Sequence, residues 1–214
     1  MVSERTAHRV VITGMGMATS LGLDLTTCWR RLLAGDNGIS KLSFWDPSEY
    51  TTKVAGEVRD IPELPAGLPL CRDAYRRGVR LFLPPVQEAF ADAGLDRIPL
   101  PVGQVGIAVG TNVNYIDMTL LKHYFQLRRH DRPVLDVARF GREGCQPASS
   151  VFRRLGDMIA RVPARLLQLA GPAIVCDTAC AASAHAVVGA FRLVRSGKVR
   201  AMIAGGSAAL WQDF

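Results

Sequence analysis

The residue with the clearest chemical potential in this sequence is Cys180, within the segment GPAIVCDTACAASAHAVVGAF. A short apolar run over residues 173–178 predicts a buried strand, and it leads through small residues directly into a segment of helical period. Cys180 would then lie at the amino-terminal end of that helix, where unpaired N–H groups and the helix dipole stabilise a thiolate or an oxyanion. The small neighbours Ala179, Ala181 and Ala182 would let a substrate reach the sulfur. A buried, inert thiol is the alternative that spacing alone leaves open.

A second candidate is the glycine-rich segment GMGMATSLG, which begins at Gly14 after a predicted strand. Such a turn can hold the phosphates of a dinucleotide, but Thr19 stands where that fingerprint needs glycine or alanine. The next acidic residue at the usual distance, Asp36, lies in a turn and not at a strand end. We therefore predict a tight turn that needs glycine for close packing or a positive φ, and no cofactor.

The cysteines indicate a reducing compartment, because their number is odd and they form no CxxC pair that would favour a disulfide framework or a zinc site. They are Cys28, Cys71, Cys145, Cys176 and Cys180. Cys28 and Cys176 lie in predicted helix and strand, so we expect both to be small apolar core side chains without reactivity. No metal site is predicted.

The elements that would position Cys180 alternate between strands and helices. Apolar runs predict strands over residues 9–13, 104–110, 173–178 and 200–206, and all but the third are closed by glycine. Segments of helical period predict helices over residues 24–34, 73–93, 115–129, 152–169 and 180–196, three of them followed by a capping glycine. This alternation favours an α/β layered fold with a mostly parallel sheet, within one domain that spans residues 1–214.

Two stretches fit that pattern poorly. Pro84 and Pro85 fall inside the second predicted helix, where each removes a hydrogen bond and clashes with the preceding turn, so we expect this helix to be kinked or split. Residues 112–150 have weak periodicity and mixed charge, and we expect them to form a divergent insertion or a cap on the sheet.

Composition indicates a soluble, cytoplasmic protein. Hydrophobic residues make up 49% and charged residues 21%, and no uninterrupted apolar stretch reaches the length of a membrane span. The formal net charge of +7 comes mostly from clustered arginines, which indicate an acidic partner or the solvated faces of helices. Nucleic acid is not the expected partner, because aromatic residues are sparse near the clusters and no DNA- or RNA-binding motif is present.

Beyond spacing, the segment DTACAASAHAV resembles the active-site segment of the elongating β-ketoacyl-acyl carrier protein synthases of fatty acid and polyketide synthesis, in the thiolase superfamily. The likeness extends along most of the chain and is weakest over residues 112–152. The opening strand, turn and first helix of that family are similar to RVVITGMGMATSLG and LLAGDNGI, and its later elements to FADAGL, VGIAVGT and MIAGGSAAL. The resemblance implies the amino-terminal half of a thiolase-like layered fold.

By that resemblance, Cys180 accepts an acyl group from an acyl carrier protein or coenzyme A thioester, and its N–H forms part of an oxyanion hole. The family completes a decarboxylative Claisen condensation with two histidines from its carboxy-terminal half, and no such motif occurs in this sequence. We therefore expect an acyltransferase half-domain that does not condense alone and works with a second polypeptide. Two readings compete with it: a non-catalytic homodimerisation or carrier-binding remnant, and a truncated product without independent function.

By the same resemblance, the histidines of this sequence do not replace the two catalytic histidines of the family's carboxy-terminal half. His8, His123 and His130 lie outside the family's catalytic positions. His185 is about 140° around the helix axis from Cys180, so the two side chains share no face and we expect a structural or interface role. Asp177 is expected to make a turn or capping contact.

Overall fold

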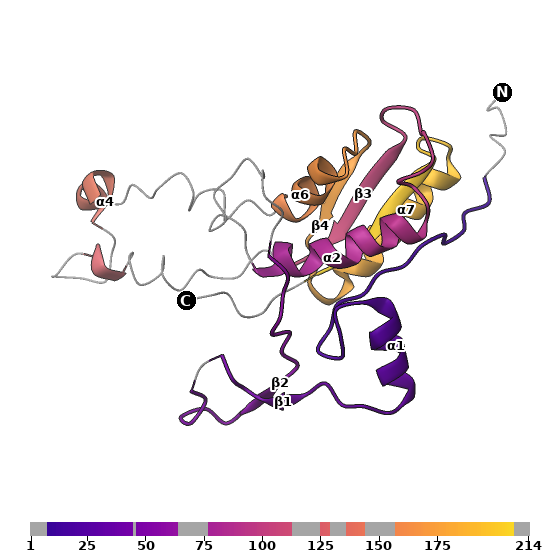
Figure 1. The fold of residues 1–214 in the computed structure, drawn as a ribbon. Helices are drawn as coiled ribbons and strands as arrows, with labels where there is room; N and C mark the ends of the chain where they lie inside the picture. The colour runs from indigo at the N-terminus through magenta and orange to yellow at the C-terminus, as the bar shows by residue number, and fades with distance from the viewer. Residues whose placement is uncertain are drawn as a thin grey trace.

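A three-stranded parallel sheet forms the core of the chain (Figure 1). The computed structural model describes residues 8–44, 46–63, 77–112, 125–128, 136–143 and 157–207. The strands lie in the order β4-β3-β5, and their bounds are Val105–Gly110 for β3, Ala173–Cys176 for β4 and Ala201–Gly206 for β5. The prediction of a mostly parallel α/β sheet is therefore confirmed.

Helices pack on both faces of this sheet because neighbouring residues of β3 point in opposite directions. Ile107 and Val109 pack with α2 and α6, while Ala108 between them packs with α7. All three side chains are fully buried, which places the centre of the core on β3. The bounds of these helices are Arg77–Asp92 for α2, Met158–Leu166 for α6 and Ala182–Arg195 for α7.

The remaining described elements lie outside this layered core (Figure 1). Helix α1 is capped by the Asp24 side chain, which accepts a hydrogen bond from the Thr27 N–H, and it ends before Gly35, whose φ is 77°. The sequence did not predict the short antiparallel pair β1 and β2. The bounds of these outer elements are Leu25–Leu33 for α1, Ser40–Lys41 for β1, Val54–Ala55 for β2 and Val137–Glu143 for α4. Helix α4 lies within residues 112–150, which were expected to form an insertion or a cap. The predicted helix over residues 115–129 lies mostly outside the described residues.

The predicted strand over residues 9–13 is wrong. This segment belongs to no ladder of the described sheet, and Val11 and Ile12 are 60% and 84% exposed. The hydrogen bond from the His8 N–H to the Arg195 carbonyl, 3.1 Å long, holds the residue before this segment against the end of α7. An apolar, β-branched run favours a strand only where a neighbouring strand accepts its hydrogen bonds, and the described residues supply none here.

Of the two outcomes expected at Pro84 and Pro85, a kink or a split, the split is wrong, because helix α2 runs without interruption across both prolines. Each proline costs a hydrogen bond and strains the turn before it. The buried side chains on either side of the prolines, Phe82, Leu83 and Val86, are 3–6% exposed and belong to the main core cluster. Burial of that apolar face offsets the cost of the prolines, since each large apolar side chain contributes about 1.5–3 kcal/mol.

Gly14 and Gly16 of GMGMATSLG allow close packing against α2, the role predicted for glycine here. A Cβ at Gly16 would overlap the Pro85 carbonyl, so the chain can approach the helix this closely only at glycine. The N–H groups of Met15 and Met17 donate to the carboxylates of Asp92 and Glu88, each at 3.0 Å. Because carboxylates of the helix already occupy these donors, the segment does not present them to a dinucleotide phosphate.

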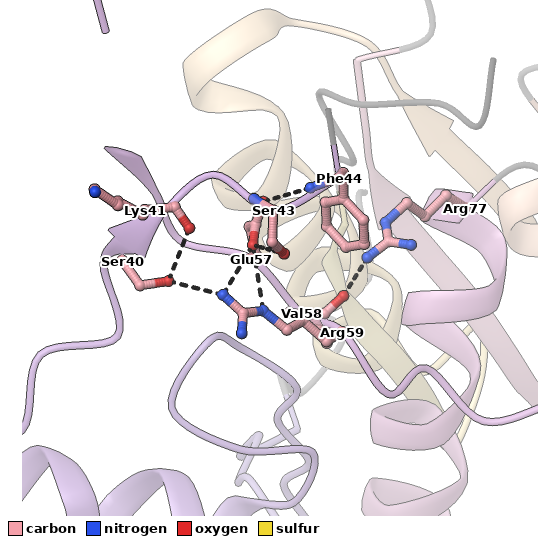
Figure 2. A network of polar contacts seen from close by, with 8 residues as sticks. All are labelled: Ser40, Lys41, Ser43, Phe44, Glu57, Val58, Arg59 and Arg77. Carbon is pink, nitrogen blue, oxygen red and sulfur yellow. Dashed lines mark hydrogen bonds and ion pairs between the residues drawn. The ribbon is translucent and has the colours of Figure 1, made fainter. Parts of the chain in front are cut away.

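A buried carboxylate ties together the segments that carry β1 and β2 (Figure 2). Glu57, whose side chain is 2% exposed, accepts hydrogen bonds from the Ser43 N–H and hydroxyl, both at 2.8 Å, and pairs with Arg59 at 3.1 Å. Burial raises the pKa of Glu57, but the bonds from Ser43 and Phe44 and the Arg59 guanidinium together hold it below its ordinary value. Arg77 extends the network to α2, since it lies over the Phe44 ring and donates to the Val58 carbonyl.

Helix α7 packs on the sheet through small residues. Ala182, Ala186 and Ala190 recur every fourth residue and are 0–4% exposed. At the carboxyl ends of the strands the contact is closest, because a Cβ at Gly110 would overlap the backbone of Ala182 and Ser183. A Cβ at Gly206 would likewise overlap the Ser183 hydroxyl. The first turn of α7 is thus fixed against the ends of β3 and β5.

We predict opposite effects for the same substitution at two glycines beside this contact. Gly110→Ala should lower the free energy of unfolding by about 1–3 kcal/mol or more, because the added methyl meets backbone that cannot rotate away. Gly189→Ala in the middle of α7 should raise it by about 0.5–1 kcal/mol, because its Cβ meets nothing within 4 Å and alanine favours helix. Urea denaturation of both variants measures the difference. A Gly110→Ala protein as stable as the wild type would contradict the close contact.

Candidate functional site

Cys180 lies in the turn that joins β4 to α7, as the sequence predicts. Strand β4 ends at Cys176, two residues follow, and a 3-10 turn, η2 (Ala179–Ala181), carries Cys180 immediately before the start of α7. The predicted helix over residues 180–196 is therefore a short turn followed by the helix proper, which ends before Gly197 with its φ of 69°. The cysteine thus sits at the amino-terminal end of a helix of 14 residues.

The thiol of Cys180 is open to solvent. Among the described cysteines, Cys180 is exposed, Cys176 is partly buried and Cys28 is 1% exposed. The Cys28 sulfur lies 3.3 Å from the Gly22 carbonyl oxygen and from the Thr19 hydroxyl, within the core side of α1. The burial predicted for Cys28 is confirmed, while Cys71 and Cys145 lie outside the described residues. Of the described thiols, only that of Cys180 is exposed to a reagent or substrate.

The backbone of this turn is open to a negatively charged ligand. Ala181, the residue before α7, has no side-chain oxygen to cap the helix, and Thr178 before η2 makes no capping bond with its side chain. N–H groups at a helix start usually receive such a cap from a serine, threonine or aspartate. Without it, the helix dipole favours a negatively charged group beside this turn, such as an oxyanion.

The residue before the cysteine holds an unusual conformation. Ala179 has a φ of 49°, in the left-handed region that costs a residue with a Cβ about 1–2 kcal/mol. Such conformations persist only where the surrounding structure holds them, and they concentrate at functional sites. Here the turn is held on one side by the end of β4 and on the other by the first turn of α7, which Gly110 and Gly206 fix against the sheet.

The histidines occupy three different situations. The Nδ1 of His185 lies 2.7 Å from the Thr178 hydroxyl, across the Cys180 turn, and forms a hydrogen bond with it. His8 contacts the other end of α7 at Arg195, roughly 20 Å along the helix at 1.5 Å per residue. His123 and His130 lie outside the described residues. Asp177 is partly buried between β4 and the turn.

Sequence reasoning missed two features of the site. Thr178 was not singled out, although a threonine two residues before a candidate nucleophile stands in a capping position. Gly110 and Gly206 were treated only as strand ends, whereas they let α7 approach. Glycine at the carboxyl end of two parallel strands is the signal that could have indicated this, because helices and strands meet closely only where side chains are absent.

Neither a metal cluster nor a membrane span is found in the part of the chain that the structure describes. Three or more His, Cys, Asp or Glu side chains nowhere gather there as a metal ion would need. No described helix is both long enough and apolar enough to cross a membrane.

Comparison with known proteins gives a single family. The chain matches the family described as "Beta-ketoacyl synthase, N-terminal domain" over residues 7–213. It is 32% identical over 204 residues to 3-oxoacyl-[acyl-carrier-protein] synthase 2 of Synechocystis sp., and the match covers 94% of this chain and 45% of that protein. The same enzyme of Coxiella burnetii is 29% identical over 205 residues, with the same coverage of both chains. The chain spans about half the length of the curated relatives it matches.

Solved structures share the fold. The ishigamide ketosynthase/chain length factor aligns with a TM-score of 0.70 and 23% identity, over 94% of this chain and 47% of that one. A type II PKS ketosynthase bound to the hexaketide, in complex with its acyl-carrier protein, aligns with a TM-score of 0.70 and 19% identity, over 95% and 46%. These likenesses confirm a thiolase-like layered fold of which the described sheet is an incomplete part.

We predict that Cys180 is the most reactive thiol of the folded protein, because it alone among the described cysteines combines exposure with a helix start. Iodoacetamide should modify it at least about tenfold faster than Cys28, which is buried, and also faster than Cys176, which is partly buried. Mass spectrometry of digested protein over a time course measures each rate, and Cys180→Ser serves as the control. Preferential labelling of Cys71 or Cys145 with Cys180 protected would contradict the site.

Proposed function

This chain belongs to the β-ketoacyl synthase family, as its amino-terminal domain, and on that premise we propose that it supplies the acyl-accepting half of a ketosynthase active site. The reaction class is acyl transfer from a thioester in fatty acid or polyketide synthesis. The observation that carries the proposal is the exposed thiol of Cys180 on an uncapped turn at the start of α7.

The geometry supports formation of an acyl thioester on Cys180. The thiolate attacks the carbonyl carbon of an acyl thioester, and the tetrahedral oxyanion that results needs N–H donors. No side chain caps the Cys180 turn, and we propose that the Cys180 N–H is one such donor, since the Ala181 and Ala182 N–H groups already donate to the Thr178 and Ala179 carbonyls. Collapse of the intermediate releases the carrier thiolate, which takes up a proton, and leaves the acyl group on Cys180.

The second half-reaction requires groups that the described part of this chain does not place at Cys180. Decarboxylation of a malonyl thioester develops an enolate, which must be stabilised within reach of the acyl-cysteine. His8 lies at the far end of α7, and the Nδ1 of His185 is engaged with Thr178. By the family resemblance the enolate is stabilised by two histidines of the carboxy-terminal half. We propose that these come from beyond the matched region, which is 45% of the Synechocystis relative.

The proposed partners follow from the same site. An acyl carrier protein that bears a phosphopantetheine thioester is the expected donor, and one structural neighbour was solved as a ketosynthase in complex with its acyl-carrier protein. A carrier of negative charge would suit the net charge of +7. Strand β4 lies at an edge of the described sheet, where a second copy could pair with it as a homodimer. The free cysteines are consistent with a cytoplasmic location.

A non-catalytic dimerisation or carrier-binding role is the second candidate. It is favoured by the exposed apolar side of α7, where Val187, Val188 and Phe191 are 41–50% exposed. An unpartnered face of this kind is typical of an interaction surface. The two candidates differ in one respect, because only the first requires a covalent acyl group on Cys180.

The prediction that separates them is acylation of the isolated chain. Incubation with an acyl-coenzyme A or acyl-carrier protein should add the mass of one acyl group, and peptide mapping should place it on Cys180. Hydroxylamine should remove the group, as it cleaves thioesters. Cys180→Ser and heat-unfolded protein are the controls, since the second retains the thiol but loses the turn. Equal acylation of folded and unfolded protein, or acyl groups on other cysteines, would favour the non-catalytic role.

A further inference from the structure

One hydrogen bond spans the Cys180 turn from the outside. The Thr178 hydroxyl and the Nδ1 of His185 are 2.7 Å apart. Thr178 is the last residue before η2, and His185 lies in the first turn of α7, so the contact joins the chain on either side of Cys180. Both side chains are exposed, and neither belongs to the core clusters that hold the sheet and helices together.

The partner of Thr178 is unusual for a threonine at this position. A hydroxyl just before a helical turn ordinarily accepts a hydrogen bond from one of the turn's N–H groups. Thr178 makes no such bond, and its hydroxyl bonds His185 instead. The histidine therefore keeps the Thr178 hydroxyl from competing for the N–H groups beside Cys180, of which the Ala181 N–H already donates to the Thr178 carbonyl at 3.2 Å.

The same contact bears on the strained backbone. Ala179, with its φ of 49°, lies between Thr178 and Cys180. The net free energy of one hydrogen bond is of the same order as the cost of a left-handed alanine, so one contact can decide which conformation the turn keeps. Gly110 and Gly206 fix the α7 side of the turn, and the Thr178–His185 bond is a side-chain contact that links the β4 side to it.

We propose that Thr178 and His185 are positioning residues for Cys180. Their hydrogen bond keeps the turn in the conformation that presents the thiol, and it keeps the threonine hydroxyl away from the N–H groups that bind an oxyanion. The proposal rests on the proposed acyl transfer but deepens it, because it assigns a role to two residues that never touch the substrate. It holds whichever of the two groups donates the proton.

The test compares variants that remove the bond with variants that keep it. Thr178→Val and His185→Ala remove one partner, whereas Thr178→Ser keeps the hydroxyl and His185→Asn keeps a hydrogen-bonding atom near the position of Nδ1. The measurement is the second-order rate constant for alkylation of Cys180 by iodoacetamide, followed by mass spectrometry. We expect the first pair to slow alkylation by roughly 3- to 10-fold, the range that one hydrogen bond supports, and the second pair to stay within about twofold of wild type.

Two further readouts distinguish positioning from a general loss of structure. The double variant Thr178→Val/His185→Ala should be no slower than either single variant, because both remove the same contact. The midpoint of thermal unfolding should stay near the wild-type value, since both side chains are exposed. Additive effects, or wild-type rates in both single variants, would overturn the proposal. If Thr178→Val does not fold, equal rates for His185→Asn and His185→Gln would overturn it instead, because glutamine reaches the Nε2 position.

The inference and the acyl-transfer proposal fail separately. Alkylation by iodoacetamide needs no thioester. If the variants show the expected pattern of alkylation rates but no thioester acylates the protein, the positioning role is retained and the acyl-transfer function is rejected. Acylation of Cys180 at equal rates in wild type and all four single variants would retain the function and reject the positioning role.

Discussion

The close approach of α7 to the sheet is the constraint on which the rest of the site depends. The helix can reach the strand ends because Gly110 and Gly206 lack side chains there and because alanines line its inner face. A larger side chain at Gly110 would move the first turn of α7 away from β3. That first turn determines the path of the chain from β4, and hence where Cys180 lies and how the backbone of Ala179 must bend. The packing of small residues between α7 and the sheet thus fixes the position of the Cys180 thiol, which lies outside that contact.

Much of this arrangement could be predicted from the sequence, because the signals are local. Apolar runs predicted β3, β4 and β5, and the small residues around Cys180 predicted a turn at a helix start. The failures have non-local causes. The run over residues 9–13 reads as a strand, yet a strand exists only with a neighbour to bond. Pro84 and Pro85 read as a break, yet burial of Phe82, Leu83 and Val86 keeps α2 intact.

The site itself was half visible in the sequence. Counting residues along a helix correctly separates Cys180 from His185, and no contact between them is described. The same count could not reveal the Thr178–His185 bond, because Thr178 precedes the helix. The left-handed backbone of Ala179 lies between Thr178 and the helix that carries His185. The Glu57 network likewise joins Ser43, Glu57 and Arg77 across distances that no spacing rule covers. Phe191 and its apolar neighbours on α7 are exposed, which only the three-dimensional structure could show.

The central claim is that this chain supplies the nucleophile of a ketosynthase whose enolate-stabilising groups lie elsewhere. The most direct measurement is formation of β-ketoacyl product from acyl and malonyl thioesters on carrier protein, with and without the part of the Synechocystis relative that this chain does not match. The account predicts product only when both polypeptides are present, and none when the chain carries Cys180→Ser. Product from the chain alone, or product from the pair that survives Cys180→Ser, would contradict it.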